Sequence, residues 1–140
     1  MIGNQQKTTL NKTSVDFLYP DLSYKLNGIL MEVLKELGPY SREKQYGDLL
    51  EKKLKEYQIA YEREVRIGDS GNIADFIIDG KIILELKTTP FLIKEHYEQV
   101  KRYLYQTDLK LGILVNFRNK QIFPKRILNI NNLRKPAELP

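Results

Sequence analysis

Three charged residues interrupt apolar segments of the sequence, and their types suit the chemistry of phosphate. Asp75 lies within residues 73–78, and Glu85 and Lys87 lie within residues 81–87. Ionised groups are costly in a buried strand unless they are paired or bind a metal. Two carboxylates with backbone or water oxygens suit Mg²⁺ or Mn²⁺, and a neighbouring ammonium could orient water and stabilise developing charge. The alternative is an ion pair between Lys87 and one carboxylate.

The turn between these two segments decides whether the charged groups can meet. Alternate residues of a strand share a face, so the two charged residues of the second segment point to the same side. A two-residue loop at residues 79–80 would put Asp75 and Glu85 on opposite faces. A loop of residues 78–80, with a glycine bulge, places them diagonally on one face, and a loop of residues 79–81 places them directly opposite each other. The site therefore requires an odd-numbered loop.

Two amphipathic helices are expected before these strands. Apolar residues recur with helical spacing in residues 22–37, and Gly38-Pro39 ends the pattern. A second helix is expected to begin with Ser41 as its N-cap and to carry Glu43 in its first turn. Its apolar stripe consists of Tyr46, Leu49, Leu50, Leu54 and Tyr57.

The spacing then changes to that of strands. Residues 61–67 and 73–78 are expected to pair across a turn at residues 68–71, and residues 81–87 have the apolar, β-branched character of a strand in the middle of a sheet. Thr88-Thr89-Pro90 ends that strand.

A third helix over residues 92–106 is expected to face inward with Ile93, Tyr97, Val100 and Leu104. Residues 111–117 form the next strand, which a right-handed crossover would make parallel to residues 81–87. Residues 121–127 form a short edge strand. The predicted fold is α/β, with a mixed sheet flanked by helices in the order α-α-β-β-β-α-β-β.

Composition narrows the chemistry to carboxylates. The chain has no cysteine, one histidine and no GxSxG motif, which excludes disulfides, thiolate metal sites, multi-histidine metal sites and a serine hydrolase. The net charge of +5 is compatible with a polyanionic partner. Without a membrane-length apolar run or a signal peptide, the protein is expected to be soluble and cytoplasmic. Its 140 residues suit one domain at residues 21–128, with polar tails at residues 1–20 and 129–140.

Several segments together resemble a known family. Ala74-Asp75-Phe76-Ile77-Ile78 followed by Ile83-Leu84-Glu85-Leu86-Lys87 resembles the D…ExK signature of the PD-(D/E)xK nuclease superfamily, whose fold is restriction-endonuclease-like. The likeness extends over roughly residues 22–128 to the small bacterial GxxExxR family within that superfamily. It also includes Leu37-Gly38-Pro39, Glu43, Tyr46, Gln99, Tyr103, residues 111–117 and residues 125–127.

The resemblance assigns a role to each matching residue. It implies that Asp75 and Glu85 are metal ligands, that Lys87 is the catalytic lysine and that Glu43 is a helix carboxylate near the metal. Gln99 and Tyr103 match a pair that contacts phosphate or positions the site in similar nucleases, and their spacing puts them on one helix face. Without the resemblance, Glu43 is a carboxylate favoured by its helix N-terminus, and the pair is a solvated glutamine beside a partly buried tyrosine.

Further basic residues are candidates for contact with a nucleic acid. His96 lies one turn before Gln99 and could contact phosphate, although a surface position is the simpler interpretation. A basic rim could be formed by Lys94, Lys101, Arg102 and Lys125-Arg126, with a solvated surface as the default.

The sequence therefore favours a Mg²⁺- or Mn²⁺-dependent nuclease that acts on nucleic acid, foremost DNA, and has no membrane partner. A catalytically silent nuclease fold that binds DNA or protein is the main alternative. An accessory subunit of a larger DNA-processing complex is a third interpretation, and a homodimer is also left open.

Overall fold

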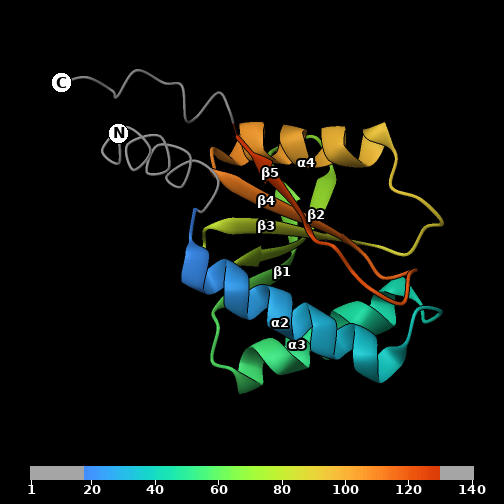
Figure 1. The fold of residues 1–140 in the computed structure, drawn as a ribbon. Coiled ribbons are helices and arrows are strands. Elements are labelled where there is room, and N and C mark those ends of the chain that lie inside the picture. Colours follow the sequence, from blue (N-terminus) through green and yellow to red (C-terminus); the bar gives the residue numbers. More distant parts are fainter. Residues whose placement is uncertain (1–17, 130–140) are drawn as a thin grey trace, which may run out of the picture.

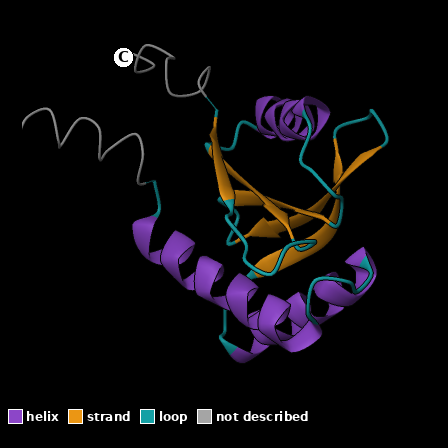
Figure 2. Ribbon diagram, turned by 45° about the vertical axis from the view of Figure 1, so that its right-hand side comes forward, coloured by secondary structure: helices purple, strands orange, loops and turns teal. Residues whose placement is uncertain are grey.

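A five-stranded sheet lies between two layers of helices (Figures 1 and 2). The computed structural model describes residues 18–129, so residues 1–17 and 130–140, most of the two predicted tails, lie outside the described residues. The eight elements follow the predicted order. They are α2 (Pro20–Leu37), α3 (Glu43–Glu56), β1 (Tyr61–Ile67), β2 (Asn72–Ile78), β3 (Ile82–Lys87), α4 (Lys94–Thr107), β4 (Leu111–Asn116) and β5 (Lys125–Leu128).

The sheet is mixed, and β3 is its central strand. The strands follow the order β1-β2-β3-β4-β5, with β3 and β4 parallel and the other pairs antiparallel. The crossover through α4 and the edge position of β5 are confirmed. That edge strand begins at Lys125 instead of residue 121, and Pro124, which has no N–H for a ladder, directly precedes it.

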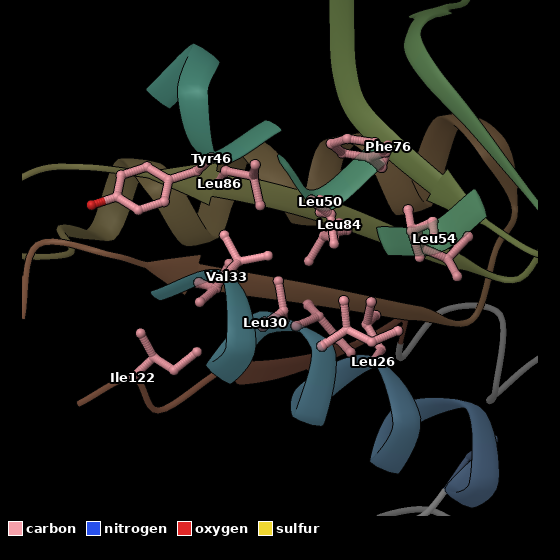
Figure 3. Close-up of a cluster of buried hydrophobic side chains, with 14 of the residues drawn as sticks. Leu26, Leu30, Val33, Tyr46, Leu50, Leu54, Phe76, Leu84, Leu86 and Ile122 are labelled. Carbon is pink, nitrogen blue, oxygen red and sulfur yellow. The ribbon is translucent and has the colours of Figure 1, made fainter. Parts of the chain in front are cut away.

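One face of the sheet is covered by α2 and α3. Leucines and valine from both helices pack on β3 and β4 in an apolar layer that Figure 3 shows in close-up. Ser41 is not the N-cap of α3. That position belongs to Arg42, whose N–H donates to Gln45 Oε1 at 2.8 Å, whereas the Ser41 hydroxyl donates to the Leu37 carbonyl at 3.3 Å. Tyr57 is half exposed, because it lies just beyond the last turn of α3.

Of the described helices, only α4 covers the other face (Figure 2). Val100 and Leu104 are buried there against Ile83 and Leu114, as their spacing predicted. Ile93 is half exposed instead of buried, because it is the extended residue before the helix begins. Among the described residues, no helix is both long and apolar enough to cross a membrane.

Candidate active site

The turn between β2 and β3 sets the position of the acidic residues. Asp79 and Gly80 both have left-handed backbone conformations, and the Lys81 N–H donates to the Ile78 carbonyl at 2.9 Å. Ile78 pairs with Ile82, so the loop consists of residues 79–81. The odd-numbered loop is thereby confirmed, in the register that sets Asp75 directly opposite Glu85.

Two crossed hydrogen bonds join Asp75 to β3, one to Glu85 and one to Leu86. The Asp75 N–H donates to Glu85 Oε1 at 2.7 Å, and the Leu86 N–H donates to Asp75 Oδ2 at 2.7 Å. The backbone ladder between β2 and β3 stops one residue earlier, at Phe76 and Leu84. Carboxylate oxygens thus accept backbone N–H groups at the point where this ladder ends. Each side chain is fixed through one oxygen, and its second oxygen makes no hydrogen bond within the described residues.

Burial works against the charge of this carboxylate pair. Glu85 is only 3% exposed, and burial followed by the nearby charge of Asp75 raises its pKa to about 8. Burial also raises the pKa of Asp75, against the opposing effects of the Leu86 N–H, Lys87 and Arg63. Two carboxyl groups in this position favour a shared proton or a bound cation over two free negative charges.

Lys87 and helix α4 form the next part of the site. The Lys87 ammonium donates to Gln99 Oε1 at 3.1 Å. The pKa of Tyr103 is raised by burial and then by the charge of Glu85, while a hydrogen bond with Gln99 lowers it. Gln99 therefore contacts the strand lysine, and the face of α4 that carries Gln99 and Tyr103 lies toward Lys87.

Glu43 reaches the site from the opposite helical layer. It is the first residue of α3 and lines a pocket of roughly 270 Å³ with Asp75 and Arg63. Although Glu43 is solvent-exposed overall, desolvation at this pocket and the charge of Asp75 raise its pKa, and Lys87 opposes the change. Within residues 18–129, no three acidic or histidine side chains are grouped so as to hold a metal ion. Glu43 thus shares the pocket without completing a three-carboxylate group.

Three further residues that were predicted to contact nucleic acid, His96, Lys94 and Arg126, do not line this pocket. His96 Nδ1 accepts the Ile93 N–H at 3.1 Å and so caps α4, and its pKa is lowered by burial and then by Lys87. Lys94 is the exposed first residue of α4 and does not line the pocket. Arg126, proposed for a basic rim, donates to Ser23 Oγ at 2.9 Å and to the Leu18 carbonyl at 3.0 Å. It ties β5 to the start of α2, which argues against a role in the rim.

Comparison with known families agrees with this geometry. A family model of the PD-(D/E)XK nuclease superfamily matches residues 20–127. The chain belongs to the PD-(D/E)XK nuclease superfamily. Its mixed sheet flanked by helices is the restriction-endonuclease-like fold expected from the sequence. Comparisons with curated proteins and with solved structures found no match.

An arginine that the sequence interpretation missed lines the same pocket as Asp75 and Glu43. Arg63 Nη1 pairs with Asp48 Oδ1 at 2.7 Å and with Glu51 Oε1 at 3.0 Å, and its guanidinium lies over the Phe76 ring. A Cβ at Gly47 would lie 2.5 Å from Arg63 Nη2. Glycine costs about 1 kcal/mol relative to alanine inside a helix, and here it makes room for the guanidinium. A glycine inside a helix, Gly47, was the only feature of the sequence that could have indicated this close contact.

The edge strand is distorted beside Asp75. Glu64 has a φ of 55°, in the left-handed region that non-glycine residues rarely adopt. The pairs Arg63–Phe76 and Val65–Ala74 are formed, but the position between them, where Glu64 would face Asp75, is unpaired. The ladders on both sides of β2 are therefore interrupted at the same residue, and such strain is typical of functional sites.

The segment after Lys87 is held by the end of β4. Asn116 accepts the Thr89 N–H at 3.1 Å and donates to the Thr89 carbonyl at 2.8 Å. Arg118 donates to the Thr88 carbonyl at 2.7 Å, and the Phe117 N–H donates to the Lys87 carbonyl at 2.9 Å. These bonds fix the backbone of the ExK strand where it leaves the sheet.

Proposed function

We propose that this chain is a divalent-metal-dependent nuclease that hydrolyses DNA phosphodiester bonds, and that within the superfamily it belongs to the GxxExxR family. One observation carries the proposal. The Asp75 N–H donates to the Glu85 carboxylate, and the Asp75 carboxylate accepts from the Leu86 N–H. On the same face of β3 as Glu85, Lys87 donates to Gln99. A purely structural ion pair would join Lys87 to a carboxylate, whereas no such pair occurs among the described residues.

The donor set fits Mg²⁺ or Mn²⁺. Both carboxylates are fixed through one oxygen and retain a second oxygen for a ligand. Burial raises the pKa of both groups, and the charge of Asp75 raises that of Glu85 further, so a bound cation would stabilise the two ionised forms. Carboxylate, backbone and water oxygens are the ligands that these hard cations prefer. Asp75 and Glu85 would hold the ion, and Glu43 lines the same pocket as Asp75. When bound, the cation supplies charge neutralisation on the phosphate and a lowered pKa for water.

Protein side chains would position the attacking water and the phosphate. Lys87, held by Gln99, carries three N–H donors and can orient the attacking water or donate to a phosphate oxygen as its negative charge grows. Tyr103, one helical turn after Gln99, is buried, and its hydroxyl donates to the Ile73 carbonyl of β2 at 3.5 Å, which fixes this face of α4 against the sheet. Glu43 lines the pocket beside Asp75, where its carboxylate could bind the ion through a water molecule.

A catalytically silent DNA-binding module is the second candidate. It is favoured by one observation, that no group of three acidic or histidine side chains is arranged for a metal within residues 18–129. In that case the carboxylate pair would carry a shared proton, and binding of DNA would need neither Asp75 nor Lys87.

Hydrolysis assays separate these candidates. The purified protein is incubated with labelled single-stranded and double-stranded DNA and RNA in Mg²⁺, Mn²⁺ or EDTA. Asp75→Asn is the decisive variant, because asparagine retains an oxygen for the Leu86 N–H and removes only the charge. Asp79→Asn is its matched control, since that carboxylate lies in the turn at the far end of β2. We expect metal-dependent cleavage that Asp75→Asn abolishes and Asp79→Asn retains.

Two results would reject the nuclease proposal. The first is the absence of cleavage of every substrate by the wild-type protein in either metal. The second is cleavage that persists in Asp75→Asn, which would point to a contaminating enzyme.

A further inference from the structure

A second pocket lies one strand away from Lys87. It has a volume of roughly 270 Å³ and lies between the loop after β3 and the loop after β4, which approach each other beyond the ends of these strands (Figure 1). Asn116 forms part of its wall and is the direct neighbour of Lys87 in the β3–β4 ladder. Neighbouring strands are separated by about 4.8 Å, so this pocket begins beside the proposed catalytic lysine.

Aromatic rings dominate the rim of this pocket. Phe91 is 79% exposed and Phe123 is 68% exposed, one on each loop, and the partly buried Tyr97 of α4 lies between the helix and the loops. Large exposed aromatic side chains that gather in one concave place mark a binding site more often than chance exposure does. Aromatic rings bind nucleobases by stacking, without regard to which base is present.

Three polar side chains of the pocket are free. Asn119, Gln121 and Lys125 line it, and within residues 18–129 none of their side chains makes a hydrogen bond or an ion pair. Asn116, which also lines the pocket, and Arg118 are by contrast engaged in holding the loop at Thr88 and Thr89. Amides offer both a donor and an acceptor to the edge of a base, and a lysine offers its charge to phosphate.

We infer that this pocket binds an unpaired nucleobase next to the scissile phosphate, so that the substrate carries a single-stranded segment. The inference rests on the proposed function, because the proposed catalytic role of Lys87 is what places the scissile phosphate beside this pocket. A base within a duplex is stacked and paired, and it would have to leave the helix before it could enter such a pocket. The bonds of Asn116 and Arg118 hold one of the two loops in place before binding, which reduces the entropy lost on binding.

Tryptophan fluorescence tests the inference directly, because the chain has no tryptophan. Phe123→Trp introduces one in the pocket, and Tyr105→Trp introduces one at a position of similar exposure on α4 that does not line it. Each variant is titrated with a short oligothymidylate and with a duplex, in EDTA so that no cleavage occurs. We expect saturable quenching only for Phe123→Trp with the single strand.

Loss of affinity provides the second measurement. By fluorescence anisotropy in EDTA, Phe91→Ala should bind the labelled oligothymidylate about tenfold more weakly than wild type, as for the loss of one stacking contact. Tyr105→Ala should bind as wild type does. Both positions are exposed, and circular dichroism melts verify that the variants fold.

Opposite results would overturn the inference. These are no saturable quenching, equal quenching for both tryptophan positions, equal quenching by the duplex, or unchanged affinity in Phe91→Ala. Metal-dependent hydrolysis by the wild-type protein, measured in parallel, separates the two proposals. Hydrolysis without quenching rejects the base pocket and leaves the nuclease, whereas quenching without hydrolysis rejects the nuclease and leaves a base-binding pocket.

Discussion

The two faces of β3 differ in what they contribute. On one face, Leu84 and Leu86 pack against the layer of α2 and α3 in a fully apolar core (Figure 3). On the other face, Ile83 is followed by Glu85 and Lys87, which meet Gln99 and Tyr103 of α4. A single strand therefore carries the stability of the domain on one side and a buried, electrostatically unfavourable site on the other. Substitutions on the two faces should have separable effects.

Removal of the Lys87 ammonium should have the largest effect. Lys87→Met should reduce hydrolysis about 100-fold or more, the range seen when a donor to developing transition-state charge is lost, with little change in the unfolding midpoint. Lys81→Met, before the start of the same strand, is the control and should retain activity. A similar loss of activity in both variants would contradict the role assigned to Lys87.

Truncation of a side chain on the apolar face of β3 should lower stability and leave the rate of hydrolysis nearly unchanged. Leu84→Ala leaves a cavity in the α2–α3 layer and should lower the free energy of unfolding by about 2–5 kcal/mol in urea titrations. At temperatures where the variant remains folded, its rate of hydrolysis should be near that of wild type. A loss of activity without a loss of stability would show that the two faces are not separable.

The pairing register of β2 and β3 shows how much of the site's geometry the sequence could predict. The order of the elements, the central position of β3 and the requirement for an odd-numbered loop all followed from hydrophobic spacing and strand alternation. The choice between the diagonal and the directly opposed register did not follow. Both loops use Gly80 and keep both carboxylates on one face, so only the tertiary structure selects residues 79–81.

Long-range contacts account for most of what the sequence did not reveal. The Arg63 guanidinium fits over Gly47, but these residues lie on different elements, and no sequence motif predicts their contact. The loop bonds of Asn116 and Arg118 likewise join residues about thirty positions apart. Ser41 was a reasonable N-cap by residue type, but the side chain of Gln45 favours a helix start one residue later.

The pH dependence of stability should show whether the polar face of β3 buries Glu85 as a neutral acid. The folded protein keeps a proton on Glu85 up to about pH 8, whereas the unfolded chain releases it near its ordinary pKa of 4.5. Because the native state binds more protons in this window, the free energy of unfolding in EDTA should fall as the pH rises through it. Glu85→Gln cannot ionise, so its stability relative to wild type should increase across the window. A difference that does not vary with pH would show that Glu85 is not buried as a neutral acid.

The smallest expected effect concerns the rim of the site. Gly47→Ala places a methyl group against the Arg63 guanidinium and should destabilise the protein by about 1–3 kcal/mol, with a partial loss of activity as Arg63 moves away from Asp75. Gly28→Ala, also within a helix but with open space around it, should stabilise the protein instead. Equal effects of the two substitutions in thermal melts would contradict the packing role of Gly47.

Binding of Mn²⁺ in the absence of DNA tests the central claim most directly, because it asks whether the crossed carboxylates hold a cation. Calorimetric titration of wild type, Asp75→Asn, Glu85→Gln and the turn control Asp79→Asn would measure it above the pKa of Glu85. We predict binding to wild type and to Asp79→Asn, and none to the other two variants. Equal binding by wild type and Asp75→Asn, or no binding by wild type, would contradict the assignment of Asp75 and Glu85 as metal ligands.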